Sequence, residues 1–557
     1  MTFVITAPCC NDASCAAVCP VNCIHPTPDE PEFATADMLY IDPDSCVDCG
    51  LCLVACPVSA IVPEHQLVER DRRFLEVSVD YYRDHRVDGP AAFTDDLIPL
   101  PPDHQMRVAI VGAGPAGFYA AEELLRHGRI RVDMFDRLPT PYGLVRGGVA
   151  PDHPQTKAVE QTLAGIAAHA NFNYLLNVTV GRDVTHQELA DNYHAVIYAV
   201  GAATEKSLGI PGEDLPGSVS GVDFVGWYNG HPDHAGDDYR FDHERAVVIG
   251  NGNVAIDIAR MMLRSPDDLA LTDAADHAVE SLRMSRVSEV VLLARRGVAQ
   301  AAYTLPELVA LGDMPGIDVV IDPAELALDE QTLAARDAGT LDSVLAAKIA
   351  LAEELSIRPP VPGNRRLVLR FLQAPTEIVG DSEVCAVRMV RTEYLPGAGQ
   401  ARVVATDKTT ELAAGLVISA IGYRGQPVPG IPFDPARGVV PNENGRVHDS
   451  GRIQTGVYVT GWIKRGATGG VGVNRRCGQE TARAVLSDYA AGDLGEPRQR
   501  GASVGSLLES RNVRVVDKVG WARIDAGEQA EGRASGRRRA KIVSIPDLLA
   551  VADGVIR

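Results

Sequence analysis

The chain has 557 residues and a formal net charge of −21, and an allowance of roughly 150 residues per domain predicts three or four domains. The negative charge argues against nucleic acid as a partner, because binding a phosphate backbone needs a basic surface. No apolar run approaches the roughly 18 residues that a membrane-spanning helix needs, so we expect no membrane insertion.

Cysteines dominate the start of the chain, where nine of the eleven lie within the first 56 residues. The second group reads Cys46-x2-Cys49-x2-Cys52-x3-Cys56-Pro57. Bacterial ferredoxins use this spacing to bind one iron–sulfur cluster with three thiolates and another cluster with the fourth. A zinc site would favour two widely separated CxxC pairs, so the pattern disfavours zinc and disulfide bonds. The sequence predicts a two-cluster module over residues 1–70.

The first group keeps the same frame but has an aspartate in place of the second thiolate: Cys9-x2-Asp12-x2-Cys15-x3-Cys19-Pro20. Three thiolates favour [3Fe–4S], although a carboxylate is a weaker ligand that could hold a fourth, labile iron. We therefore predict one [4Fe–4S] cluster and one cluster that is either [3Fe–4S] or [4Fe–4S]. The predicted ligands of the [4Fe–4S] cluster are Cys19, Cys46, Cys49 and Cys52. The predicted ligands of the other cluster are Cys9, Cys15 and Cys56, with Asp12 as a fourth ligand if that cluster holds a fourth iron.

Two further cysteines accompany these frames. Cys10 could replace Cys9 as a ligand, whereas Cys23 is more simply a small buried thiol. Nothing at the start resembles a secretion signal, because a short strand over residues 2–6 leads directly into the cysteines. Thiolates that hold iron must stay reduced, so we expect a cytoplasmic location.

Behind the cysteine module, residues 71–105 show no apolar periodicity and end in the proline-rich stretch 98–103, which predicts an extended linker. Strands and helices then alternate from residue 107 onward, the pattern of βαβ units in a parallel sheet.

The first of these units carries a dinucleotide-binding pattern. A buried strand over residues 108–111 leads into Gly112-x-Gly114-x-x-Gly117 and a helix over 118–125. Glycines there let a pyrophosphate approach the helix N-terminus, where free N–H groups favour an anion. Asp136 ends the next strand about 20 residues on, as a ribose-binding carboxylate would. The alternative is that Asp136 only terminates the strand.

A second such pattern begins at a strand over residues 247–249 and reads Gly250-Asn251-Gly252-Asn253-Val254-Ala255. The following strand, 289–293, is followed by Arg295 and Arg296 instead of an acid. Guanidinium groups bind the 2′-phosphate of NADP, which an acidic residue would repel. This favours NADP over NAD, the alternative being two arginines on an exposed turn.

No CxxC pair follows either glycine loop, which disfavours electron transfer from a flavin to a disulfide. Cys385 and Cys477 stand alone in the sequence and are expected to be core thiols. The chemistry is therefore expected to belong to bound cofactors.

Several longer stretches resemble the adrenodoxin reductase-type ferredoxin:NADP reductases: residues 138–146, 148–154, 250–255, 421–424 and 461–466. With a ferredoxin module in front, the chain is similar to the FprB-type bacterial ferredoxin/ferredoxin:NADP reductases. The resemblance implies an α/β multidomain fold with two Rossmann-like domains behind an α+β ferredoxin module. The FAD domain would comprise residues 106–206 and 424–557, with the NADP domain, 207–423, inserted between them.

The resemblance also implies an enzyme, ferredoxin–NADP(+) reductase. NADPH would give a hydride to FAD, and single electrons would pass to the clusters and on to a one-electron protein acceptor, such as a cytochrome P450 or another ferredoxin. The alternative is an NADPH–flavin oxidoreductase whose module serves in docking or in sensing oxygen or iron.

Specific residues follow from the matched motifs. His153 and Glu307 would lie near the redox centre, unless the histidine only closes a turn and the glutamate only begins a helix. The stretch 469–475, Gly-Gly-Val-Gly-Val-Asn-Arg, departs from the regular family pattern. The implied FAD contacts are Gly112, Ala116, Asp136, Leu144, Val178, Trp462, Gly469, Gly470 and Val471, and the implied NADP contacts are Asn251, Gly252, Asn253, Val254, Arg295, Arg296 and Glu307.

Overall fold

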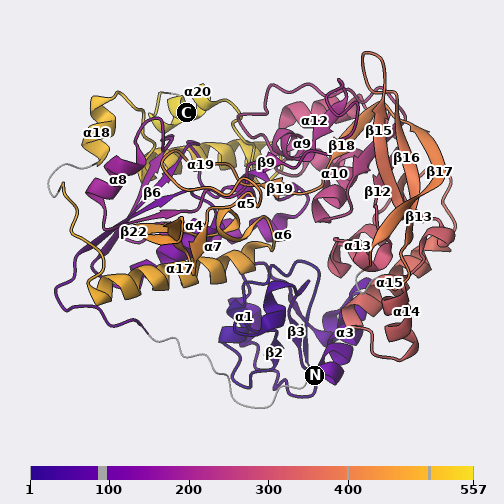
Figure 1. Cartoon of the computed structure of the whole chain (residues 1–557), viewed down its shortest axis with the longest axis horizontal. Coiled ribbons are helices and arrows are strands. Elements are labelled where there is room, and N and C mark those ends of the chain that lie inside the picture. The colour runs from indigo at the N-terminus through magenta and orange to yellow at the C-terminus, as the bar shows by residue number, and fades with distance from the viewer. Residues whose placement is uncertain (1, 86–96, 398–400, 500–503, 556–557) are drawn as a thin grey trace.

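The computed structural model describes residues 2–85, 97–397, 401–499 and 504–555. Two mainly parallel sheets flanked by helices form the larger part of the molecule, and a small module from the start of the chain lies below them in Figure 1. The expected class, α/β multidomain with an α+β module in front, is confirmed. None of the helices in the described ranges combines the length and apolar character needed to cross a membrane.

The first sheet has seven strands in the order β20-β21-β22-β8-β5-β6-β7. Its centre is parallel and joins distant parts of the chain, because β22 pairs with β8. In β5, residues 108–111 are all buried apolar side chains, as a strand covered on both faces requires. The bounds are β5 Met106–Val111, β6 Ile130–Asp136, β7 Phe172–Leu176, β8 Ala195–Tyr198, β20 Asn442–Glu443, β21 Arg446–Asp449 and β22 Arg452–Val459.

Helices from both ends of the sequence cover this sheet, and α17 packs along α4 (Figure 1). Gly478 permits this close packing, since a Cβ atom there would lie 2.7 Å from the carbonyl oxygen of Ala116. The bounds are α4 Pro115–Leu125, α5 Leu144–Gly147, α6 Pro154–Lys157, α7 Val159–Ala167, α8 His186–Asn192, α16 Trp462–Arg465, α17 Val471–Ala491, α18 Val504–Ser510, α19 Lys518–Ala534 and α20 Ile545–Ala552.

The second sheet has six parallel strands in the order β10-β18-β11-β12-β14-β13, beside a three-stranded antiparallel sheet, β15-β16-β17. A short antiparallel pair, β9 with β19, accompanies the two crossings between the sheets. The strand bounds are β9 Thr204–Glu205, β10 Ser218–Ser220, β11 Arg245–Ile249, β12 Glu289–Leu293, β13 Ile317–Ile321, β14 Arg365–Arg370, β15 Gln373–Val379, β16 Ala386–Tyr394, β17 Val403–Ala413, β18 Leu416–Ser419 and β19 Tyr423–Arg424.

Helices flank this second sheet as well, and α10 packs against β12 and β11. Its buried side chains follow one another almost without interruption after Val254, which is why the helix lies deep in the domain. The bounds are α9 Gly221–Tyr228, α10 Asn253–Leu263, α11 Pro266–Ala270, α12 Asp276–Arg283, α13 Leu305–Gly312, α14 Glu330–Asp337 and α15 Ser343–Ser356.

The module at the start of the chain is built from two short antiparallel pairs, β1 with β4 and β2 with β3. Two short helices, α1 and α2, contact one another and carry cysteines from the two groups. The bounds are β1 Phe3–Ile5, α1 Ser14–Ala17, β2 Ile24–His25, β3 Tyr40–Ile41, α2 Leu51–Ala55 and β4 Ile61–Pro63.

The prediction of an extended linker over residues 71–105 is wrong for its first part. Helix α3, Arg72–Asp84, buries Phe74, Val77 and Tyr81 on one face. These apolar residues lie at helical spacing, but the charged residues between them hide the pattern in the sequence. The prediction for 86–96 falls outside the described residues, and residues 97–105 contain no helix or strand.

Helix α3 attaches the module to the domain built around the second sheet, because it contacts α15 of that domain. Arg73 of α3 also forms an ion pair with Glu354 of α15 at 3.6 Å. Figure 1 shows the module between α15 on one side and α17 of the first domain on the other. The module therefore contacts both nucleotide-binding folds.

Candidate functional site

One cavity of about 1520 Å³ lies where the carboxyl ends of strands from both parallel sheets meet, the usual binding location in such sheets. Every residue that the sequence predicts for FAD, NADP or the redox centre lines it. These are Gly112, Ala116, Asp136, Leu144, His153, Val178, Asn251, Gly252, Asn253, Val254, Arg295, Arg296, Glu307, Trp462, Gly469, Gly470 and Val471.

The first glycine loop has the shape of a pyrophosphate cradle. Gly112 adopts a φ of 109°, and a Cβ atom there would lie 2.4 Å from the carbonyl oxygen of Ala199. Gly114, by contrast, has open space where its Cβ atom would project. It is the N-cap of α4, and no side chain caps that helix. Free N–H groups and an open approach fit the diphosphate of FAD.

Asp136 lies at the end of β6 and borders the same loop. Its carboxylate accepts hydrogen bonds from the backbone N–H groups of Ala113 at 2.8 Å and Leu138 at 2.9 Å. Burial raises the pKa of Asp136, and these N–H groups oppose that rise. The carboxylate thus ties β6 to the glycine loop while still lining the cavity, a position that fits a ribose hydroxyl.

The second glycine loop repeats this construction at α10. Gly250 has a φ of 138° and lies close to the carbonyl oxygen of Ala420, and α10 also begins without a side-chain cap. Arg295 and Arg296 follow β12 and are exposed. Within the described residues, neither guanidinium has a hydrogen-bond or ion-pair partner, and Thr392 bonds only to the backbone carbonyl of Arg295. Both guanidiniums are therefore available to a phosphate.

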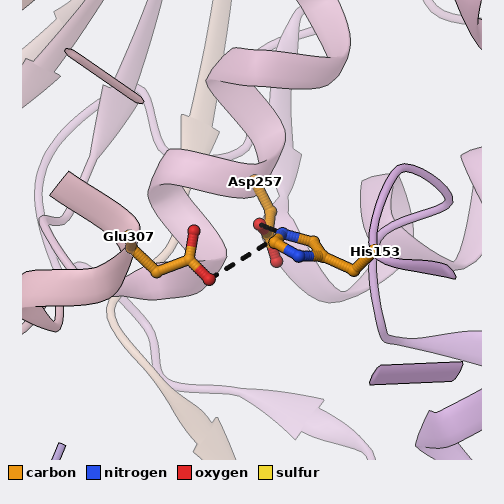
Figure 2. A group of neighbouring side chains, drawn as sticks. All are labelled: His153, Asp257 and Glu307. Atoms are coloured by element: carbon orange, nitrogen blue, oxygen red, sulfur yellow. Dashed lines mark hydrogen bonds and ion pairs between the residues drawn. The ribbon is translucent and has the colours of Figure 1, made fainter. Parts of the chain in front are cut away.

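A group of three titratable side chains borders the cavity: His153, Asp257 and Glu307 (Figure 2). His153 immediately precedes α6, Asp257 lies in α10, and Glu307 lies in the first turn of α13. The Nε2 atom of His153 lies 3.3 Å from a carboxylate oxygen of Asp257 and 3.8 Å from one of Glu307. His153 and Glu307 therefore lie close together at the cavity. Glu307 also lies in the first turn of a helix, which is the simpler role that the sequence left open for it.

Arg260, one turn after Asp257, contacts this group as well. Its guanidinium lies 2.6 Å from Asp257, 3.1 Å from Glu307 and 2.7 Å from Asp152, and it also contacts Nε2 of His153. Asp152, Asp257 and Arg260 were not predicted from the sequence. The sequence offers one indication of this group: Asp257 and Arg260 are three residues apart on a helix that follows a glycine loop, so they lie on the same helix face.

Charge balance explains how this group holds protons. The side chains of Asp152, Asp257 and Glu307 surround Arg260, and Arg264 adds a second guanidinium 2.9 Å from Asp152. Burial alone would lower the pKa of His153, but the nearby carboxylates outweigh it and raise the pKa. Burial also raises the pKa of Glu307. One added proton therefore brings three carboxylates and two guanidiniums to neutrality.

The ligand atoms of His153, Asp257 and Glu307 lie within 4.8 Å of one another, close enough for a metal ion. The guanidinium of Arg260 already contacts all three side chains. A fixed cation there repels a metal ion and satisfies the carboxylates. We therefore interpret the group as an ion-pair network.

The four cysteines predicted to bind [4Fe–4S] line one small pocket in the module: Cys19, Cys46, Cys49 and Cys52. Cys23 lines it as well, with its sulfur 3.4 Å from that of Cys19. Four thiolates converging on one pocket are a donor set suited to a cubane cluster. Cys49 is exposed, so this pocket lies near the surface of the module.

The second cysteine set faces the reductase. Cys9 and Cys10 both line the nucleotide cavity, whereas Cys15 is buried and burial raises its pKa. Cys9, Cys10, Cys15 and Cys56 lie near one another, since Cys9 and Cys10 both interact electrostatically with Cys56, and Cys15 interacts with Cys9 and Cys56. Three of these thiols fit a cluster with three protein ligands, in which iron would supply the positive charge that thiolates need. Cys10 stays the alternative to Cys9.

Asp12 lies beside these thiols, but its carboxylate has other partners. It accepts hydrogen bonds from the backbone N–H and hydroxyl of Ser14. It also pairs with Arg475 of α17 at 3.2 Å. Cys477 is buried as expected, whereas Cys385 is exposed, so the prediction of a core thiol is wrong there.

Comparison with known proteins agrees with this architecture. Residues 106–299 match the family model "Pyridine nucleotide-disulphide oxidoreductase", and residues 39–62 match "4Fe-4S binding domain". A probable ferredoxin/ferredoxin–NADP reductase of Mycobacterium tuberculosis is 44% identical over 99% of this chain and 95% of its own length. A protein of the same description from Mycobacterium leprae is 43% identical over 100% of this chain and 98% of its own length.

Among solved structures, FprA of Mycobacterium tuberculosis in complex with NADPH is similar with a TM-score of 0.75 and 44% identity. The match covers 81% of this chain and 100% of that one. The relation to the first set of proteins spans the cysteine module as well as both nucleotide-binding folds.

Proposed function

The chain belongs to the family of ferredoxin/ferredoxin–NADP reductases, and we propose that it passes electrons from NADPH, through its own iron–sulfur module, to a one-electron protein acceptor. FAD and NADPH binding and a 4Fe–4S binding domain are features of the family fold. The proposal adds a second cluster, of three or four irons, at the Cys9 site. A cytoplasmic location agrees with the need to keep the seven ligand thiols reduced.

The observation that carries the proposal is that Cys9 and Cys10 form part of the cavity wall. FAD, when bound, can take a hydride from NADPH and release electrons singly, which is the chemistry an iron–sulfur acceptor needs. A ligand of one cluster site lies in the wall of the flavin cavity, and the other cluster site is near the surface. This order supports a relay from the interior of the molecule outward.

The residues of the two glycine loops bind and orient the nucleotides in this proposal. The N-termini of α4 and α10 bind diphosphates with free N–H groups. Arg295 and Arg296 hold the 2′-phosphate and so select NADPH. Asp136 accepts a ribose hydroxyl, and the opening at Gly114 leaves the diphosphate room to approach.

His153 has a role in proton balance. Oxidation of NADPH to NADP⁺ releases two electrons and one proton, and iron–sulfur clusters accept only the electrons. A proton must therefore leave the cavity in each turnover. The Nε2 atom of His153 can hold that proton, because Asp257 and Glu307 stabilise the imidazolium form.

An anaerobic titration of the holoprotein with NADPH, followed by EPR spectroscopy, tests the proposal. We expect NADPH to reduce the flavin and then to produce the signal of a reduced [4Fe–4S] cluster. If the flavin is reduced while both clusters stay oxidised, the relay is refuted and a docking or sensing module is favoured.

A further inference from the structure

Gly472 in the first turn of α17 is required by a contact outside its own helix. Its φ lies outside the left-handed region, so backbone conformation does not demand glycine there. A Cβ atom at this position would lie 1.6 Å from the carbonyl oxygen of Asn11 and 2.5 Å from the backbone nitrogen of Asp12. The N–H of Gly472 donates to the carbonyl of Cys10 at 2.9 Å. Only glycine admits the cluster loop so close to the helix.

Arg475 lies one turn after Gly472 on α17 and binds the same loop. It pairs with Asp12 at 3.2 Å and donates to the hydroxyl of Ser14 at 2.5 Å. Its guanidinium also lies over the ring of Tyr119, 5.6 Å from the ring centre. Asp12 is buried, so this is an ion pair largely removed from solvent, where loss of one partner is costly.

The turn of α17 that receives the loop also borders the nucleotide cavity. Gly470, Val471 and Asn474 line that cavity, as does Cys9 on the other side of the contact. The contact therefore lies beside the flavin cavity, next to the cysteines of the first cluster. Two residues of the irregular stretch 469–475, Gly472 and Arg475, thus contact the loop.

A second anchor fixes the module to the other domain. Asp37 accepts a hydrogen bond from the backbone N–H of Leu305 at 2.9 Å. Leu305 is the first residue of α13, which lacks a cap from its own Thr304. With two anchors on two domains, the module is fixed in one orientation instead of moving on a tether.

We infer that Gly472 and Arg475 form a docking site on which the loop Cys10–Asp12 is held permanently, and that Asp12 is an anchor of this site and not an iron ligand. The inference rests on the proposed relay, because the docking site keeps the first cluster beside the flavin cavity. One NADPH supplies two electrons and each cluster accepts one, so both clusters are reduced as NADP⁺ and a proton are released.

The test compares two glycine substitutions in the full-length holoprotein. Gly472→Ala inserts a methyl group into the contact, whereas Gly165→Ala, in α7, meets open space. In the Gly472 variant we expect NADPH-driven cluster reduction, followed by rapid-freeze EPR, to slow at least tenfold. Ferricyanide reduction by NADPH and cluster reduction by dithionite should match the wild type, and the Gly165 variant should be unchanged throughout.

Cluster reduction at the wild-type rate in the Gly472 variant would overturn the docking site. If that variant loses FAD, Arg475→Gln provides the same comparison without a steric change. Failure of NADPH to reduce the clusters even in the wild type would refute the relay itself, and so differs from failure of the docking site.

Asp12→Asn separates an anchor from an iron ligand. If Asp12 is an anchor, the variant should show slower cluster reduction by NADPH. Its iron content and the EPR spectrum of the oxidised protein should stay as in the wild type. Incubation of the wild type with ferrous iron and reductant should leave the Cys9 site with three irons. Conversion to four irons that depends on Asp12 would overturn the assignment.

Discussion

Arg260 organises the charged wall of the nucleotide cavity. Three carboxylates, on α10, on α13 and just before His153, contact one guanidinium that is almost fully buried. Buried charges persist in a fold only when paired, so each of these side chains fixes the position of the others. The position of His153 beside the cavity thus depends on a residue that never lines it.

The charge of the His153 group predicts a dependence of stability on pH. The folded-state pKa is raised above the unfolded value of about 6.5. The stabilisation by protonated His153 is therefore complete below about pH 6.5 and is lost as pH rises through the folded pKa. The variant His153→Gln cannot take up this proton at any pH, so it lacks the pH-dependent part of the stabilisation.

We expect the difference in unfolding free energy between the wild type and His153→Gln to be larger at pH 6 than at pH 9. Urea unfolding of both proteins at the two pH values measures it. A difference that stays constant with pH would show that His153 gains no partner for its charged form.

Nucleotide choice depends on Arg295 and Arg296. Each guanidinium should provide a charge-assisted hydrogen bond worth about 1.5–3 kcal/mol, roughly 10- to 150-fold in affinity. Arg295→Glu or Arg296→Glu should therefore raise the KM for NADPH by such a factor and spare NADH. Steady-state kinetics with both nucleotides check this, with Arg437→Glu, on an exposed turn, as the control. Unchanged NADPH kinetics in both variants would remove the basis for the assignment.

Among the elements, α19 and α5 form a buried connection between distant parts of the sequence. Glu528 of α19 accepts from both terminal nitrogens of Arg146 in α5, at 2.6 and 2.8 Å, and from Arg539 at 2.8 Å. Burial would raise the pKa of Glu528, but these guanidiniums lower it. Since Leu144 of α5 lines the cavity, the pair also supports the flavin site.

Glu528→Gln should leave the buried guanidinium of Arg146 without a carboxylate, while Arg539 keeps Asp525. The loss should cost on the order of 3–5 kcal/mol in stability. We expect a lower urea midpoint and loss of FAD during desalting, measured by absorbance. Glu531→Gln, an exposed position on the same helix, should behave like the wild type. Equal midpoints for the two variants would contradict the role of the buried pair.

At the scale of the whole molecule, the module is one wall of the reductase. It touches α17 in one domain and α13 and α15 in the other. A fixed module makes electron transfer independent of diffusion within the chain. It also supplies part of the cavity wall, through residues that include Cys9, Cys10 and Asn11.

A protein beginning near Met106 should bind FAD and reduce ferricyanide with NADPH, because the FprA structure it resembles matches the remaining 81% of the chain. It should lose most of its activity toward cytochrome c, a large one-electron acceptor that the clusters would serve. Parallel assays of the two acceptors measure the ratio. Full reduction of cytochrome c by the shortened protein would favour the docking or sensing alternative.

Local patterns were sufficient for the parts of this protein whose chemistry depends on short spacings. A glycine loop before a helix binds phosphate through its own backbone, and cysteines spaced by two and three residues converge on one pocket. The cavity accordingly contains each predicted nucleotide residue, and one pocket contains the four predicted cysteines. Helix α3 is the main element that the sequence did not predict, because charged residues separate its few buried apolar residues and hide their helical spacing.

Tertiary structure decided what depends on distant partners. Asp12 pairs with Arg475, 463 residues away, and His153 meets Asp257, 104 residues away. No local spacing announces such a pair, since its energy comes from burying two charges that only folding brings together. The sequence by itself therefore determined the cofactor-binding motifs, whereas the three-dimensional fold decided that Asp12 faces an arginine and that the module is fixed beside the flavin cavity.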